Sequence, residues 1–165
     1  MNLVTLVILA GAVGSLSTSC SIGNGESSRP TERQQYSYQE QEVSFENDRD
    51  SITLVGTLTI PDSPRPAAAV ILIPNSSSDR DESAGRHRPL QVLAAHLARG
   101  GLIVLRSDSR GIGHSGGSAW PDVTKSDIAS DVEAAIKYLR RKTGIGSTRI
   151  GLIGHSEGEI GRAHV

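Results

Sequence analysis

The stretch Arg149–Gly158, which reads RIGLIGHSEG, constrains the fold of this chain more than any other part of it. A short apolar run, Ile150–Ile153, leads directly into Gly154-His155-Ser156-Glu157-Gly158. Glycines on both sides of a serine permit a turn that is too tight for larger side chains. The stretch therefore predicts a buried strand that ends in a sharp turn, the G-x-S-x-G elbow. Ser156 would be exposed at this turn and is the candidate nucleophile.

The same five-residue pattern occurs a second time, at Gly113-His114-Ser115-Gly116-Gly117. The elbow requires its serine just past a buried strand and before a helix. Ser115 lies well beyond the apolar run Leu102–Leu105, and Ala119-Trp120-Pro121 follows it in place of a helical pattern. We therefore interpret the segment around Ser115 as a flexible glycine-rich loop and keep Ser156 as the candidate.

Two kinds of pattern precede the elbow. Residues 43–59 alternate apolar and polar side chains on either side of Asn47-Asp48-Arg49-Asp50, which predicts an antiparallel hairpin. Next, buried strands predicted at Ala67–Ile73, Leu102–Leu105 and Ile150–Ile153 alternate with two apolar stripes at helical spacing. The first helical stripe ends at Gly100-Gly101 and consists of Leu90, Leu93, Ala94 and Leu97. The second begins after Thr124 with Asp127, ends at Gly144 and consists of Ile128, Val132, Ala135, Ile136 and Leu139.

This order of elements predicts an α/β fold, in which an antiparallel hairpin leads into a mostly parallel sheet flanked by helices. In such sheets the chemistry gathers in the loops at the carboxyl ends of the strands. One of these loops reads Pro74-Asn75-Ser76-Ser77-Ser78-Asp79-Arg80-Asp81-Glu82, a composition typical of a polar surface turn and a solvated charge cluster. Small residues there also allow a backbone N–H to face inward, as an oxyanion hole requires.

The next loop contains Gly111-x-Gly113-x-x-Gly116, which formally matches a dinucleotide-binding pattern. In dinucleotide-binding domains that pattern lies directly after a strand and at the start of a helix, and an acidic residue stands at the end of the next strand. Here polar residues intervene, no helical pattern follows, and the next strand ends in Gly154. We therefore expect no cofactor, and the single cysteine argues against a Cys-rich metal site.

Three motifs in this order resemble the α/β-hydrolase superfamily: Asp79-Arg80-Asp81-Glu82, Asp108-Ser109-Arg110-Gly111-Ile112-Gly113 and Gly154-His155-Ser156-Glu157-Gly158. The likeness covers about residues 42–158 and is greatest to bacterial esterases grouped with dienelactone hydrolases and serine aminopeptidases. It implies that Ser156 is the nucleophile and that Glu157 supplies one oxyanion N–H. A residue near Ser76 or Ser77 would supply the other, although relatives usually carry glycines where this loop has Asn75 and serines.

The resemblance also implies that an acid and a histidine follow the nucleophile in the sequence. His87, His96, His114 and His155 precede Ser156, and the only later histidine is His164. The tail 159–165, EIGRAHV, is what a sequencing adapter would encode, so we expect it to be non-native. The chain is thus expected to be the N-terminal half of a hydrolase and to be inactive by itself.

The N-terminal segment predicts export. Leu3–Leu16 is apolar but short for a membrane span, and small residues lead from it to Cys20, which resembles the end of a bacterial lipoprotein signal. We expect a signal peptide at 1–20 and a flexible polar tether at 21–41, ahead of the folded domain at 42–158. Either Cys20 is lipidated, giving a membrane-anchored lipoprotein, or cleavage nearby releases a periplasmic protein; a cytoplasmic protein with an apolar N-terminus is the alternative.

Composition narrows the possible partners. The 17 Lys and Arg nearly balance the 18 Asp and Glu, and aromatic residues are 3% of the chain, so no basic field or stacking platform favours nucleic acid. We expect a serine hydrolase whose substrates are small carboxylic esters. The alternatives are a serine peptidase that cleaves short peptides on the same fold, and a lipoprotein that uses the scaffold for binding without catalysis.

Overall fold

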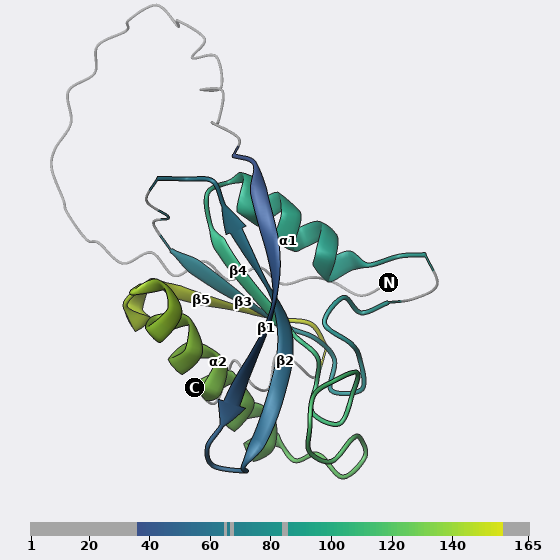
Figure 1. Cartoon of the computed structure of the whole chain (residues 1–165). Coiled ribbons are helices and arrows are strands. Elements are labelled where there is room, and N and C mark those ends of the chain that lie inside the picture. Colours follow the sequence, from purple (N-terminus) through teal and green to yellow (C-terminus); the bar gives the residue numbers. More distant parts are fainter. Residues whose placement is uncertain (1–35, 65, 67, 84–85, 157–165) are drawn as a thin grey trace, which may run out of the picture. The chain divides into compact units, whose positions relative to one another are not determined.

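The computed structural model describes residues 36–64, 66, 68–83 and 86–156, which form one mixed sheet with helices on both faces (Figure 1). No helix among these residues is both long and apolar enough to cross a membrane. Cys20, the predicted signal peptide and the predicted tail lie outside the described residues. The elements are β1 (Tyr38–Asn47), β2 (Ile52–Pro61), β3 (Ala69–Ile73), α1 (Pro89–Arg99), β4 (Ile103–Ser107), α2 (Lys125–Thr143), a 3₁₀ turn (Ser147–Arg149) and β5 (Ile150–Gly154).

The predicted hairpin is present as β1 and β2, which pair along their whole length from Tyr38 opposite Pro61 to Asn47 opposite Ile52. β1 begins at Tyr38, upstream of Glu42, where the sequence predicts the folded part to start. The additional residues are mostly polar and exposed, so they carry no hydrophobic pattern. Backbone pairing with β2 orders them all the same.

The strand order is β1-β2-β4-β3-β5. β2 runs antiparallel to β4, whereas β3 runs parallel to both β4 and β5. Because β3 lies between β4 and β5, the connections β3-α1-β4 and β4-α2-β5 cross the sheet in opposite directions. Right-handed crossovers in opposite directions place their helices on opposite faces, as Figure 1 shows for α1 and α2.

Alternate residues of the central strands supply the two core layers. On the α2 face, Ile71, Ile73 and Leu105 pack with Val132 and Leu139. On the α1 face the core is smaller and consists of five buried residues, Val70, Leu72, Leu90, Ala94 and Val104. β3 is buried along its whole length, as its uninterrupted apolar run predicts.

The ends of α2 follow the sequence signals. Thr124 Oγ1 accepts a hydrogen bond from Asp127 N at 3.2 Å, and Thr124 N donates to Asp127 Oδ2 at 2.9 Å, which completes a capping box. At the other end Gly144 adopts φ 71°, a left-handed conformation that glycine tolerates best. α2 is therefore fixed in length and direction before it leads into β5.

A buried arginine joins the start of α2 to the hairpin turn. Arg110 donates to Asp131 from Nε at 2.8 Å and from Nη2 at 2.7 Å, and its Nη2 also lies 2.7 Å from Asp50 Oδ2. Hydrogen bonds from Arg110 and then from Arg49 lower the pKa of Asp50 to about 2. The folded chain therefore stabilises the ionised form of the Asp50 carboxyl group relative to the unfolded chain.

We predict that this pairing makes the fold sensitive to acid. A carboxylate whose pKa is depressed from 3.8 to about 2 stabilises the fold above pH 3.8, and this contribution is lost as the pH falls towards 2. Asp50→Asn should therefore be less stable than wild type at pH 6, and the difference should shrink between pH 4 and pH 2. Urea denaturation at a series of pH values measures it, and parallel pH curves for the two proteins would contradict the prediction.

Candidate active site

The elbow lies at the end of β5. His155 N donates to Ile73 O at 3.1 Å, which continues the β3–β5 ladder one residue beyond the strand. Ser156 follows at once, is exposed, and has φ 54°. A serine seldom adopts positive φ, and residues held in this region are concentrated at functional sites. The structure thus holds Ser156 in a strained turn beside the end of β3, while Glu157 lies outside the described residues.

The loop that leaves β3 beside this turn is held at Asn75. Asn75 O accepts hydrogen bonds from Ser78 N and from Ser109 Oγ, both at 2.9 Å. A trans peptide is planar, so the direction of a carbonyl fixes that of the next N–H, which points the opposite way. The two bonds to Asn75 O therefore fix the direction of the Ser76 N–H.

The two predicted oxyanion donors in this loop have different environments. Ser76 is buried and lines a pocket at the carboxyl ends of β3 and β4, together with Ile73, Ser109 and Val132. Ser77 is exposed, and its N–H donates to Asn75 Oδ1 at 3.0 Å within the turn. Ser76 therefore lies at the pocket, whereas Ser77 lies on the surface of the turn.

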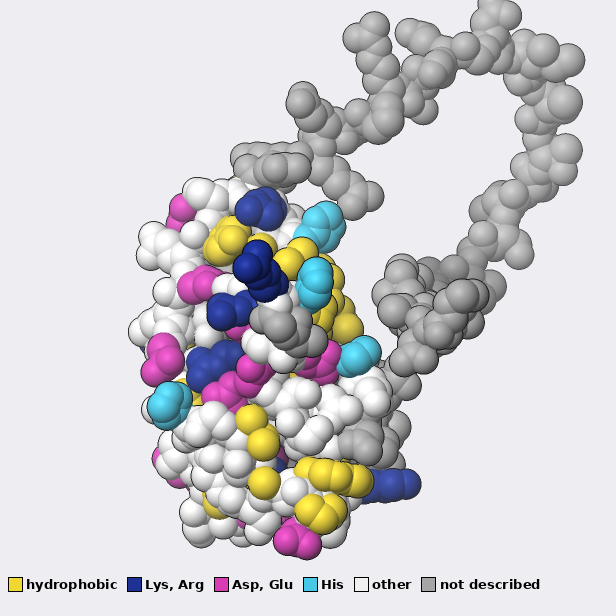
Figure 2. Space-filling model, turned by 90° about the vertical axis from the view of Figure 1, so that its right-hand side faces the viewer, with side chains coloured by type: hydrophobic (Ala, Val, Ile, Leu, Met, Phe, Trp, Pro, Cys, Tyr) yellow, Lys and Arg dark blue, Asp and Glu magenta, His cyan; other side chains and the backbone are white. Residues whose placement is uncertain are grey.

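The run Asp79–Glu82, whose composition suggests solvated surface charge, has a structural partner for every charged side chain. Asp79 Oδ1 accepts hydrogen bonds from the N–H groups of Asp81 and Ser83, both at 3.0 Å. Asp81 pairs with Arg106, which is 1% exposed and also lies 2.5 Å from Glu40. Sequence composition could not show the pairing of Asp81, because its partner Arg106 comes from β4. On the face in Figure 2, acidic and basic side chains accordingly lie next to one another.

Arg80 and Asp108 connect the loops after β3 and β4. Arg80 donates to Asp108 Oδ1 from Nε at 2.9 Å and to Oδ2 from Nη2 at 2.8 Å, and its backbone N–H donates to Oδ1 at 2.9 Å. Burial raises the pKa of Asp108, but the hydrogen bonds and charge of Arg80 outweigh it, so the pKa lies below its usual value. Asp108 therefore acts as an ionised anchor for the loop after β3.

The glycine-rich loop after β4 packs around this anchor. Gly113 has φ 58°, and a Cβ built there would lie 2.5 Å from Asp108 Oδ2. Ser115 is buried, and its Oγ accepts from Val55 N at 3.0 Å and donates to Asp108 O at 3.1 Å. The loop is thus hydrogen-bonded to β2 and to Asp108, which differs from the predicted flexible loop. The glycines serve this packing, and α2 begins only at Lys125.

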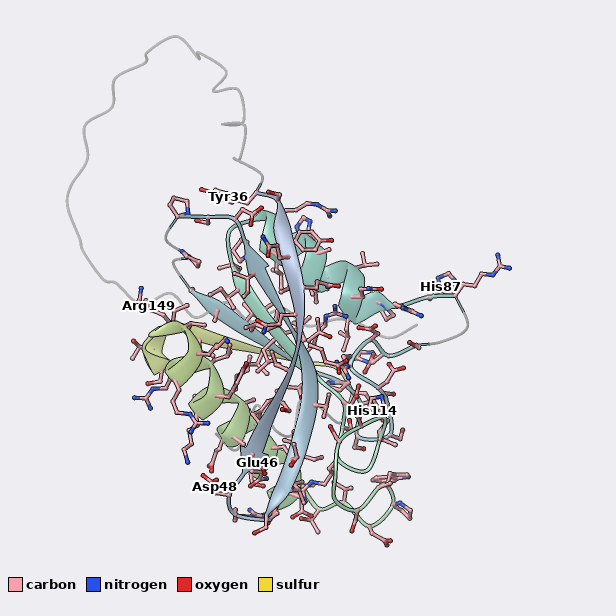
Figure 3. All side chains as sticks on the ribbon, in the orientation of Figure 1. Tyr36, Glu46, Asp48, His87, His114 and Arg149 are labelled. Atoms are coloured by element: carbon pink, nitrogen blue, oxygen red, sulfur yellow. The ribbon has the colours of Figure 1, made fainter. Side chains whose placement is uncertain are left out.

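Glu82 lies between the β3 loop and the elbow. Its Oε1 accepts a hydrogen bond from Asn75 N at 2.6 Å, and its Oε2 lies 2.6 Å from His155 Nδ1. His87 and His114 lie on the loops before α1 and α2, and His87 projects away from the sheet (Figure 3). His155 is thus committed to Glu82. His164 lies outside the described residues.

The described residues contain no group of three or more His, Cys, Asp or Glu side chains arranged to hold a metal ion. The chemistry that they can support rests on a serine hydroxyl and on oriented backbone N–H groups. This set of groups suits acyl transfer, in which a hydroxyl attacks a carbonyl and N–H groups stabilise the oxyanion that forms.

We predict that Gly113 is required for the packing of the β4–α2 loop. Gly113→Ala should lower the free energy of unfolding by about 1–3 kcal/mol, because alanine is strained at positive φ and its Cβ would collide with Asp108. Gly146→Ala is the matched control, since a Cβ at Gly146 would meet no atom within 4 Å. Urea denaturation compares the two, and equal stability of both variants would contradict the role given to Gly113.

Comparisons with known proteins bear on the fold of the chain. No family profile matches the chain. The curated esterase EstD of Thermotoga maritima is 30% identical over 131 residues, which are 79% of this chain and 31% of the relative. The chain therefore spans about a third of the length of that relative.

Solved structures give the same result for the fold. The α/β hydrolase GrgF from Penicillium sp. has a TM-score of 0.65 at 24% identity, and the match covers 76% of this chain and 41% of that one. The Pyrococcus furiosus esterase Pf2001 has a TM-score of 0.60 at 26% identity, over 75% of this chain and 44% of that one. With its strand order and its serine turn after β5, the chain has the fold of the N-terminal part of an α/β hydrolase, and it is similar to esterases of that fold.

Proposed function

We propose that this chain carries the nucleophile and the oxyanion hole of a serine hydrolase that cleaves small carboxylic esters. The observation that carries the proposal is Ser156 itself, which is exposed and strained one residue beyond the β3–β5 ladder. The neighbouring β3 loop supports it, because the bonds to Asn75 O fix the direction of the Ser76 N–H. Relatives named as esterases favour esters over peptides as substrates.

The proposed reaction proceeds through an acyl-enzyme. Ser156 Oγ attacks the ester carbonyl carbon while a base takes its proton, and the carbonyl oxygen becomes an oxyanion. The N–H groups of Ser76 and Glu157 stabilise that oxyanion. The alkoxide then leaves with the proton, the acyl group stays on Ser156, and water releases it as a carboxylic acid.

The general base comes from outside the described residues in this proposal. His155 is bound to Glu82, and the other described histidines lie before the elbow on exposed positions. In the family resemblance the acid and the histidine follow the nucleophile, and the relatives are longer than this chain. We propose that the gene encodes these residues downstream. Export and lipidation at Cys20 remain predictions from the sequence.

We predict that a fluorophosphonate probe labels Ser156 in the product of the complete gene, because an activated serine attacks the phosphorus and displaces fluoride. Ser156→Ala should abolish labelling and lower ester hydrolysis by about 10³-fold or more. Ser115→Ala is the matched control, since it removes the serine of the other G-x-S-x-G match and should keep labelling. A folded wild-type protein that is not labelled would favour the binding lipoprotein, and faster cleavage of aminoacyl p-nitroanilides than of esters would favour the peptidase.

A second prediction concerns the 165-residue chain by itself. The described residues offer Ser156 no general base, and a serine hydroxyl without a base is a poor nucleophile near neutral pH. We therefore expect that this chain does not hydrolyse p-nitrophenyl acetate above the rate of its Ser156→Ala variant. The same assay on the product of the complete gene provides the positive control. Hydrolysis by the 165-residue chain that depends on Ser156 would show that the base lies within it.

A further inference from the structure

The geometry points to Glu82 as a positioning residue, which holds the β3 loop and the nucleophile turn at a fixed separation. We call its two contacts, with Asn75 N and with His155 Nδ1, the Glu82 bridge. The bridge follows from the described contacts alone, whereas its effect on catalysis rests on the proposed function. Neither the three motifs nor the elbow pattern assigns this role to Glu82.

The bridge joins two segments that are distant in sequence but adjacent in space. Glu82 Oε1 accepts from Asn75 N at 2.6 Å, and Oε2 lies 2.6 Å from His155 Nδ1. The Glu82 side chain is only 9% exposed, whereas that of His155 is 54% exposed. Both carboxylate oxygens are thus used, one on each segment, in a place largely closed to water.

The backbone of Glu82 is held in an unusual conformation that directs the side chain into the bridge. Glu82 has φ 52°, which is rare for a residue with a long side chain. Its N–H donates to Asp79 O at 3.1 Å, and the two residues before it are anchored by Asp108 and by Arg106. The surrounding ion pairs therefore maintain a conformation that is strained by itself, as is common at functional sites.

The position of the bridge gives it a defined effect on the oxyanion hole. In the proposed reaction the Ser76 N–H donor belongs to the β3 loop, and the nucleophile Ser156 belongs to the turn after β5. Glu82 binds the residue before Ser76 on one side and the residue before Ser156 on the other. The Ser76 N–H must lie close to where attack by Ser156 forms the oxyanion, so a change in the separation of the β3 loop and the turn raises the barrier to reaction.

Three variants of the product of the complete gene test the bridge. Glu82→Ala removes both contacts and should lower kcat by about 10²-fold with KM within about twofold, because the lost interaction acts on the transition state. Glu82→Gln keeps the shape and an acceptor for Asn75 N, so it should recover most of that loss. Glu46→Gln is the matched control: Glu46 is exposed on β1, accepts from Thr53 Oγ1, and should keep wild-type kcat.

A double-mutant cycle with His155→Ala shows whether the two residues act through one contact. If they do, the Glu82→Ala/His155→Ala double variant should lose no more kcat than the worse single variant. Losses that multiply would overturn the bridge, as would a Glu82→Ala enzyme with a lowered Tm and unchanged kcat.

Amide hydrogen exchange at Asn75 tests the bridge without relying on catalysis. Loss of the acceptor in Glu82→Ala should speed exchange of the Asn75 N–H by about tenfold or more, while Glu46→Gln leaves it unchanged. A wild-type protein that does not hydrolyse esters would refute the proposed function. The exchange rate of the Asn75 N–H would still test the bridge in that case. Unchanged exchange in Glu82→Ala would overturn it, and if that variant does not fold, the same comparison is made with Glu82→Leu, which is similar in size and also lacks the acceptor.

Discussion

The rest of the structure depends on the parallel pairing of β3 with both of its neighbours. β3 is buried along its length and pairs with β4 on one side and β5 on the other. Parallel strands end at the same edge of a sheet, so this pairing brings the loops after β3, β4 and β5 together. The bond from His155 N to Ile73 O then places the serine turn directly beside the β3 loop. Without this register the serine turn would not lie beside the β3 loop.

Buried charges then fix the loops at that edge. Arg80 donates two hydrogen bonds to the Asp108 carboxylate, and Asp81 forms a salt bridge with the buried Arg106. Burying an ion pair costs desolvation energy that the attraction does not always recover, so such pairs are weak evidence for stability. Their geometric effect is clearer, because a bidentate pair permits only one relative placement of the two loops. The ion pairs of Arg80 and Asp81 thus fix the part of the loop that leads into Glu82.

The sequence predicted the elements well because their signals are local. Alternation predicted the hairpin, Thr124 with Asp127 predicted the start of α2, and the apolar run before Gly154 predicted the strand of the elbow. Contacts between segments that are distant in the sequence produce no such local pattern. The partners of Asp79–Glu82 and the hydrogen bonds of Ser115 could therefore not be read from composition, and polar Gln39–Gln41 gave no sign of joining β1.

Strain links the fold to the proposed chemistry. Ser156 and Glu82 both adopt positive φ, at a cost on the order of 1–3 kcal/mol each. Glu82 contacts His155, the residue directly before Ser156. Neither conformation would persist in an isolated loop, because nothing there would outweigh the strain. The β3–β5 ladder holds one and the ion pairs of Arg80 and Asp81 hold the other. The sheet and the buried charges therefore stabilise a serine turn and a loop of N–H donors in a geometry that neither segment would adopt alone.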